Sequence, residues 1–162
     1  EKLQVIDVGT GSGCLAITTK LEFPELEVFG LDISKECLEV ARKNAKKLAA
    51  DVKFYEGDLL KPLYNLEPKI SNLILLCNLP YVPDSHTINQ AAMHEPKIAI
   101  FGGPDGLDSY RQLFDHVATL SVKPDYLLAE SLPPQHKALA EIAKQHGYNL
   151  NKTDDFIQLF SL

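Results

Sequence analysis

A polar and aromatic tetrapeptide, Asn78-Leu79-Pro80-Tyr81, follows directly after the apolar run Leu73–Cys77. Asn and Pro commonly end a strand in a turn, and this is the simplest interpretation of the tetrapeptide taken alone. The same residues can also do chemistry, because an Asn side-chain oxygen accepts hydrogen bonds and a Tyr ring offers a flat surface. Such a set at the edge of a sheet can hold a planar group that carries an NH2. The rest of the chain has to decide between the two interpretations.

A second candidate site is the glycine-rich segment 7–13, DVGTGSG. It follows an apolar run and precedes a helical pattern. Its three glycines therefore allow a tight turn and the close approach of a ligand at a helix N-terminus. A plain strand-to-helix turn needs fewer glycines and no acid, so the segment favours a nucleotide-like ligand. Its G-x-G-x-G spacing differs from the G-x-G-x-x-G of dinucleotide-binding proteins. The loop residues that we assign to cofactor binding are Asp7, Gly9, Thr10, Gly11, Ser12 and Gly13.

Two further acids lie where predicted strands end. Asp32 follows the second apolar run, at the place where an acid accepts the hydroxyl groups of a ribose, and Ile33 beside it is assigned to the same site. Asp58 and Leu59 follow the third run, where they are expected to border an adenine ring with the carboxylate near the amino group. A Gly-Asp pair is also common in plain turns, so the second assignment depends on the first.

Apolar runs alternate with helical patterns along the chain, which predicts the elements that position these residues. Strands are expected at 3–8, 26–32, 51–58, 72–78, 125–131, 148–153 and 155–161, and helices at 13–23, 34–48, 107–120 and 133–147. This alternation predicts one α/β domain, 1–162. Its doubly wound, mostly parallel seven-stranded sheet should carry helices on both faces and bind ligands at the carboxyl ends of its strands. The last two strands are so close in sequence that they should be antiparallel neighbours.

Composition restricts the classes of protein that remain. The 162 residues are 45% hydrophobic and 23% charged, which is ordinary for a globular domain, and no run resembles a membrane span or a signal peptide. The net charge of −6 argues against a domain that binds nucleic acid through its phosphates alone. Cys14, Cys37 and Cys77 lack metal spacing, as do the histidines, so we expect reduced thiols, no metal site and a cytoplasmic protein.

The glycine loop, Asp32 and the order of the strands resemble class I S-adenosylmethionine-dependent methyltransferases over essentially the whole chain. The resemblance implies a Rossmann-like fold and S-adenosyl-L-methionine as the cofactor. Asn78-Leu79-Pro80-Tyr81 is similar to the (D/N)PPY motif of methyltransferases that modify planar NH2 nitrogens. It implies that the Asn78 oxygen and the Leu79 carbonyl accept hydrogen bonds from the two N–H groups, while Tyr81 packs against the planar group. Asn78, Leu79, Pro80 and Tyr81 are then catalytic, and Asn78 also borders the cofactor.

The segment 94–114 narrows the expected substrate. It resembles the HemK-like glutamine-N5 methyltransferases of peptide chain release factors, which implies a protein-(glutamine-N5) methyltransferase with a release factor as its substrate and partner. The matching positions are Glu95, Pro96, Gly102, Gly103, Asp105, Gly106, Leu107, Tyr110 and Arg111. Leu79 replaces the first Pro of the family's Asn-Pro-Pro-Tyr, and the C-terminal segment lacks the family's Gly-Arg-rich hairpin. The chain begins without Met almost directly on a strand, so we expect the family's helical N-terminal domain to be absent from it.

Two alternatives stay open. Asn-Leu-Pro-Tyr also occurs in the rRNA adenine-N6 dimethylases, so the first alternative is an adenine-N6 methyltransferase that acts on RNA or DNA. The net charge and the series after residue 94 weigh against it. The second alternative is a nucleotide-binding domain without this activity, either a NAD-dependent oxidoreductase domain or a degenerate scaffold. The glycine spacing and Asn78 weigh against the oxidoreductase, whereas Leu79 keeps the degenerate scaffold open.

Overall fold

A computed structural model describes residues 3–64, 72–87 and 96–162. Its strands are β1 Gln4–Val8, β2 Glu27–Asp32, β3 Val52–Glu56, β4 Leu73–Cys77, β5 Tyr126–Glu130, β6 Asn149–Asp154 and β7 Ile157–Ser161. Its helices are α1 Cys14–Glu22, α2 Lys35–Lys47, α3 Asp108–Thr119 and α4 His136–Gln145, with short 3-10 turns at η1 Lys61–Tyr64, η3 Lys97–Ala99 and η4 Pro133–Gln135. Each strand and helix predicted from the sequence is present, with only its ends shifted.

The seven strands form one sheet in the order β3-β2-β1-β4-β5-β7-β6. Strands β1 to β5 are parallel to one another, and β7 is antiparallel to both β5 and β6. The predicted mixed α/β fold is therefore confirmed. The strand order reverses between β1 and β4, and open α/β sheets bind ligands beyond the carboxyl ends of the strands at such a point. Val8 pairs with Cys77 in this register, so the residues that follow them leave the sheet side by side.

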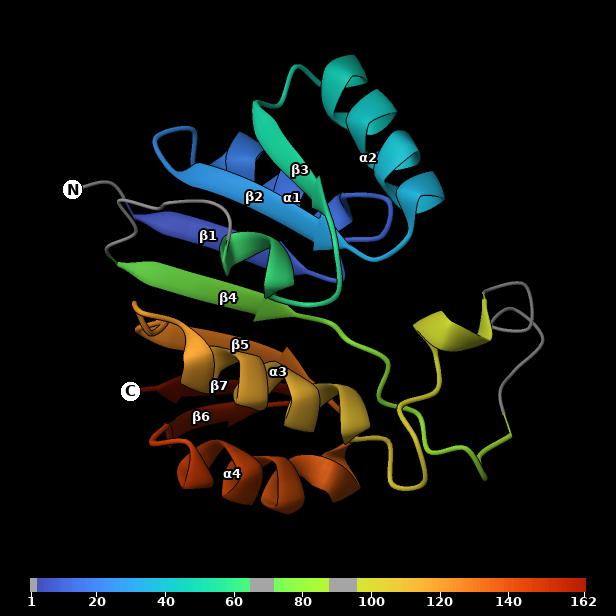
Figure 1. Cartoon of the computed structure of the whole chain (residues 1–162), viewed down its shortest axis with the longest axis vertical. Helices are drawn as coiled ribbons and strands as arrows, with labels where there is room; N and C mark the ends of the chain where they lie inside the picture. The colour runs from blue at the N-terminus through green and yellow to red at the C-terminus, as the bar shows by residue number, and fades with distance from the viewer. Residues whose placement is uncertain (1–2, 65–71, 88–95) are drawn as a thin grey trace.

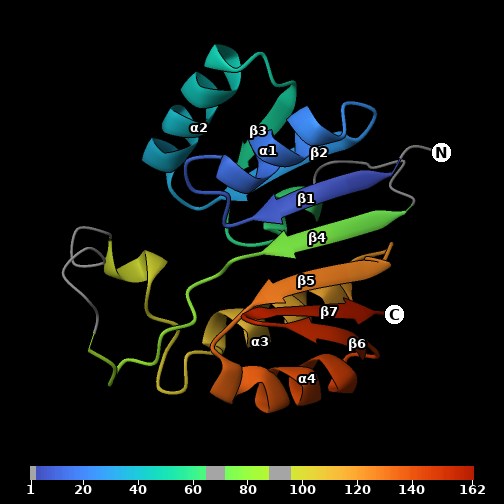
Figure 2. The same cartoon turned by 180° about the vertical axis from the view of Figure 1, so that it is seen from behind.

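Helices cover both faces of the sheet (Figure 1). Helices α1 and α2 pack on the half formed by β1, β2 and β3, where Ala16 meets Val5 and Val28 and Ile17 meets Ala45. The larger core lies on the opposite face, where α3 and α4 pack over β4, β5 and β7. The view from behind shows α1 and α2 in front of the sheet and α3 beyond it (Figure 2). None of the described helices is long and apolar enough to cross a membrane.

Local sequence explains where the helices begin and end. The Ser34 hydroxyl accepts a hydrogen bond from the Cys37 amide at 3.1 Å and caps α2, as Ser commonly does at this position. Pro133 and Pro134 lack backbone N–H groups, and the chain passes through the 3-10 turn η4 before α4 begins. Gly147 follows α4 with a φ of +88°, the left-handed conformation in which a glycine commonly ends a helix.

Candidate active site

The glycine loop joins β1 to α1, and its three glycines face different surroundings. Their φ angles are +73° at Gly9, +56° at Gly11 and +83° at Gly13, a region that favours glycine. A Cβ added at Gly13 would lie 3.0 Å from the Ile17 side chain and 3.1 Å from Ala41, so this glycine lets α1 and α2 approach each other. A Cβ added at Gly11 would meet no atom within 4 Å. Gly11 therefore borders open space on the accessible side of the loop, whereas the exposed Gly9 faces the Leu79 side chain.

Asp7 and Thr10 hold the loop from its buried side. The Asp7 carboxylate is 2% exposed and accepts hydrogen bonds from the Thr10 hydroxyl at 2.6 Å and from the Ala16 amide at 3.1 Å. Burial nevertheless raises the pKa of Asp7 to about 6. The side chain of Ser12 is exposed, and its backbone carbonyl joins the loop to α2 by accepting a hydrogen bond from Asn44 Nδ2 at 3.0 Å. Asp7 and Thr10 thus fix the shape of the loop, and the Ala16 amide and the bond from the Thr10 amide to the Leu31 carbonyl join it to α1 and β2.

Asp32, at the end of β2, lies beside the open part of the glycine loop. One carboxylate oxygen accepts the Gly11 amide at 2.7 Å, and the other accepts the Ser34 amide at 2.8 Å. An ionised carboxylate offers about four lone-pair sites, so both oxygens keep capacity for a hydroxyl group. The next side chain, Ile33, is 58% exposed and offers an apolar surface. This arrangement fits a ribose on Asp32 and a flat ring against Ile33.

Asp58 and Leu59 follow β3 on the same edge of the sheet. The backbone amide of Gly57 donates to the Asp32 carbonyl at 2.9 Å, which places this turn next to β2. Asp58 pairs with Lys61 at 2.6 Å, so one of its oxygens already has a partner. Leu59 has a φ of +48°, and its half-buried side chain packs against the larger core. Contact of this pair with an adenine ring stays a prediction.

The tetrapeptide after β4 lies next to the glycine loop. Asn78 is exposed, and its side chain makes no hydrogen bond within residues 3–64, 72–87 and 96–162. Leu79 points the other way: its side chain is 3% exposed, and a Cβ added at Gly9 would lie 3.2 Å from Leu79 Cδ2. Leu79 therefore fills the space between the tetrapeptide and the loop. The Asn78 amide remains available to a ligand at the same edge.

Two tyrosines attach the tetrapeptide to β5. The hydroxyl of Tyr110, on α3, binds the carbonyl oxygens of Cys77 at 2.9 Å and of Glu130 at 2.5 Å, so it bridges the ends of β4 and β5. The Tyr81 hydroxyl donates to Glu130 Oε1 at 2.8 Å. Burial and the Glu130 carboxylate raise the pKa of Tyr81 to about 12, so its ring is neutral at physiological pH. Sequence reasoning missed Glu130, although an acid at the end of a strand next to β4 was a usable signal.

The segment 100–107 supports the tetrapeptide through its backbone. The Val82 amide donates to the Ile100 carbonyl, and the Gly102 amide donates to the Val82 carbonyl, both at 3.0 Å. A Cβ added at Gly102 would come closer than 3.0 Å to the Pro80 carbonyl oxygen, and one at Gly106 equally close to that of Tyr81. Both glycines are therefore needed for the close approach of two backbones.

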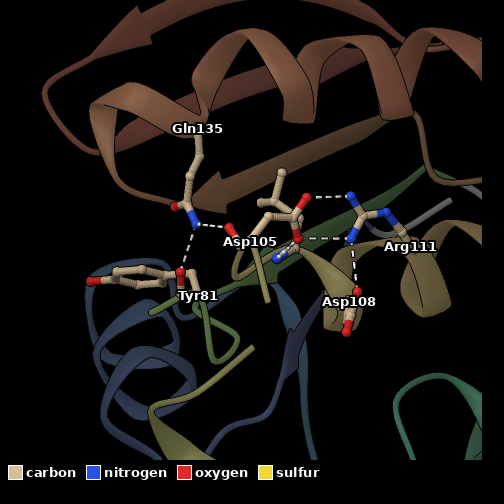
Figure 3. A network of polar contacts seen from close by, with 6 residues as sticks. Tyr81, Asp105, Asp108, Arg111 and Gln135 are labelled. Atoms are coloured by element: carbon tan, nitrogen blue, oxygen red, sulfur yellow. Dashed lines mark hydrogen bonds and ion pairs between the residues drawn. The ribbon is translucent and has the colours of Figure 1, made fainter. Parts of the chain in front are cut away.

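An ion pair and a buried amide complete this support (Figure 3). Arg111 pairs with Asp105 at 2.5 Å and with Asp108 at 2.8 Å, and this pairing lowers the pKa of Asp105 to about 2. The Gln135 amide bridges the Tyr81 and Asp105 carbonyls. The structure thus brings the 102–111 part of the predicted series together with the tetrapeptide. Pro96 directly precedes η3, whereas Glu95 lies outside the described residues.

Sequence comparison relates this chain to known methyltransferases. Residues 1–96 match the family described as Methyltransferase domain. The chain is 44% identical over 126 residues to a release factor glutamine methyltransferase of Bacillus anthracis. The aligned residues cover 76% of this chain and 44% of that protein. The chain is 38% identical over 160 residues to the protein of the same name from Deinococcus radiodurans, covering 96% of this chain and 55% of that protein. The chain thus spans about half the length of the curated relatives it matches.

Comparison of structures supports the fold. The structure of TrmK from M. capricolum, in complex with S-adenosyl-homocysteine, aligns with a TM-score of 0.64 and 16% sequence identity. This alignment covers 99% of this chain and 61% of that one, and at such low identity it shows a shared fold alone. The predicted Rossmann-like methyltransferase fold is confirmed. Because the family match includes more than half of its residues, the chain belongs to the Methyltransferase domain family.

Proposed function

We propose that the protein is an S-adenosylmethionine-dependent methyltransferase that modifies the side-chain amide nitrogen of a glutamine in a peptide chain release factor. The observation that carries the proposal is the exposed Asn78 amide, without a hydrogen-bond partner among the described residues, next to a glycine loop with open space at Gly11. The two relatives named release factor glutamine methyltransferase support the choice of glutamine.

The cofactor lies at the glycine loop in this proposal. Gly11 leaves room for it, Asp32 accepts its ribose hydroxyls, and Ile33 faces its ring. When bound, S-adenosylmethionine supplies a methyl group on a positively charged sulfur. Asp7 and Thr10 contribute indirectly, because their hydrogen bond keeps the loop in its open shape.

The chain's own residues have to make a poor nucleophile react. The nitrogen of an amide shares its lone pair with the carbonyl group, so it attacks weakly and must be oriented well. The Asn78 oxygen and the Leu79 carbonyl accept hydrogen bonds from its two N–H groups and direct it toward the methyl group. These bonds strengthen as positive charge develops on the nitrogen, so they lower the barrier more than they improve substrate binding. Formation of the N–C bond would be balanced by loss of the methyl–sulfur bond, which would leave the cofactor as a neutral thioether, and one of the two protons would then pass to water. The neutral Tyr81 ring packs against the planar group.

Mass spectrometry of a purified release factor, incubated with the protein and S-adenosylmethionine, tests the proposal. We expect one added methyl group on a glutamine side chain. Methylated adenine in RNA or DNA, with an unmodified release factor, would contradict the choice of substrate. No transfer to either substrate, despite cofactor binding, would indicate a degenerate domain.

The Asn78→Ala variant tests the mechanism. We expect kcat to fall by roughly 10²–10³, the range seen when one preorganised polar group is removed from a transition state. Asn149, exposed on the edge strand β6, offers a matched control, and Asn149→Ala should keep its rate. A rise in KM with an unchanged kcat would assign Asn78 to substrate binding and refute the mechanism.

A further inference from the structure

Gln135 connects three loops beside the candidate site with a single side chain. Its Nε2 group donates to the Tyr81 carbonyl and to the Asp105 carbonyl, both at 2.7 Å, and its Oε1 accepts the Leu132 amide at 2.8 Å. The residue is 8% exposed and stands at the end of η4, just before α4. Figure 3 shows its amide directed between the two carbonyl groups. One buried amide thus joins the segment after β4, the turn at 102–106 and the segment after β5.

The chemistry of these three contacts matches glutamine. Two carbonyl oxygens require two donors, one backbone amide requires an acceptor, and a primary amide provides both on one planar group. A glutamate of the same shape would lose both donors and set a carboxylate against two carbonyl dipoles. Alanine would leave two partly buried carbonyls without these donors, so both hydrogen bonds would be lost.

The bond from Gln135 to the Tyr81 carbonyl reaches the backbone of the tetrapeptide Asn78-Leu79-Pro80-Tyr81. The Tyr81 carbonyl lies two residues after Leu79, whose own carbonyl is the second acceptor in the proposed mechanism. The Tyr81 hydroxyl is fixed separately by Glu130, and the Val82 amide by Ile100. The Tyr81 carbonyl and the Val82 amide belong to one peptide group, so Gln135 and Ile100 together fix the plane of this group, two residues beyond the Leu79 carbonyl.

We propose that Gln135 is a positioning residue for methyl transfer, which acts through the backbone of Asn78-Leu79-Pro80-Tyr81 and touches neither substrate nor cofactor. The inference rests on the proposed function for its kinetic consequence. Its structural part rests only on the contacts that the Gln135 side chain makes. Small displacements of reacting groups lower rates steeply, so loss of this contact should affect the chemical step.

Kinetics of Gln135→Ala test the proposal, with Gln4→Ala as the matched control. Gln4 is also 8% exposed and also donates through Nε2, to Glu27 at 2.7 Å, but it lies at the amino end of β1. We expect kcat per cofactor-binding site to fall about 10- to 100-fold in Gln135→Ala, with cofactor affinity within about twofold of the wild type. Gln4→Ala should keep the wild-type kcat. Equal losses in both variants, or parallel losses of kcat and cofactor affinity, would reduce Gln135 to a general stabilising residue.

A second variant separates positioning from stability. In Gln135→Glu, a protonated carboxyl group regains one donor, whereas the carboxylate has none. The rate of this variant relative to the wild type should therefore rise as the pH falls. A ratio that does not change with pH, or that falls with it, would refute the role assigned to the two donors.

Amide hydrogen exchange tests the same contact without any substrate. In Gln135→Ala the amides of Val82, Asp84 and Gly102 should exchange about tenfold faster or more, while those of β1 and β2 keep their rates. Unchanged protection at these three amides would overturn the proposal. If the wild-type protein transfers no methyl group to a release factor, the proposed function fails, and the exchange measurement still decides the role of Gln135.

Discussion

Replacing Gly106 by alanine is expected to destabilise the protein strongly, although it adds only a methyl group. Gly106 has a φ of +80°, and its added Cβ would come closer than 3.0 Å to the Tyr81 carbonyl oxygen and to Gln135 Nε2. Gly147 is the matched control, because its φ is +88° but a Cβ there would meet nothing within 4 Å. Both variants carry the same backbone strain, and only Gly106→Ala adds the steric conflict.

The difference between the two variants can be worked from these contacts. Alanine at positive φ costs about 1 kcal/mol, and this is the whole effect expected for Gly147→Ala. At position 106 the backbone must also move away from Tyr81 and Gln135, which weakens the two hydrogen bonds of the Gln135 amide. Each contributes about 0.5–1.5 kcal/mol, so weakening both costs about 1–3 kcal/mol. We therefore expect Gly106→Ala to lower the free energy of unfolding by about 1–3 kcal/mol more than Gly147→Ala.

Urea unfolding followed by circular dichroism measures both values under the same conditions. The comparison is meaningful only if the two variants unfold in a single transition with similar m-values. A loss for Gly106→Ala no larger than that for Gly147→Ala would show that the two backbones do not approach as closely as described. The account of the glycines at 102 and 106 would then be wrong.

Two further predictions concern Asp7, in the glycine loop, and Asp32, beside it. Burial raises the pKa of Asp7 from 3.8 to about 6, so the folded state binds this proton more tightly than the unfolded state. The corresponding stability is present below about pH 4 and is lost as the pH rises through about 6. Asp7→Asn should therefore gain stability relative to the wild type over this range, by up to about 2–3 kcal/mol in urea unfolding, and a difference independent of pH would contradict this. Asp32→Ala should weaken S-adenosylmethionine binding at least tenfold, because charge-assisted hydrogen bonds contribute about 1.5–3 kcal/mol each. Calorimetry measures the affinity of each variant for S-adenosylmethionine, with Asp51→Ala, at an exposed position, as the control. Equal affinity in the two variants would show that Asp32 does not bind the cofactor.

The order and type of the elements could be predicted because each carries a local signal. Apolar runs mark the strands, Ser34 marks the start of α2, and Gly147 marks the end of α4. The place of β7 was not predictable in this way. The short connection indicated that the last two strands pair with each other, but either of them could have paired with β5. The structure inserts β7 between β5 and β6, so the last strand of the chain lies inside the sheet.

The residues of the candidate site that belong to local motifs could be predicted from the sequence. The residues that support them from distant parts of the chain could not. The glycine loop, Asp32 and Asn78 follow strand ends, so their proximity follows from the parallel topology. Gln135 contacts Tyr81 across 54 residues, and Glu130 contacts it across 49. No local pattern reveals such partners, because the loops that hold them must first fold. For the same reason, the sequence indicated that Gly102 and Gly106 matter without giving the close backbone contacts that explain them.

The contact between Leu79 and Gly9 has a consequence for protein engineering. The Leu79 side chain lies where a Cβ on Gly9 would point, so the glycine loop and the tetrapeptide pack against each other through this one side chain. A proline at position 79 would withdraw that side chain and open space above Gly9. A library that randomises position 79 to change acceptor preference would therefore also select for cofactor affinity. Randomising positions 9 and 79 jointly lets each loop readjust to the other, and we expect functional variants to pair a smaller residue at 79 with greater tolerance at 9.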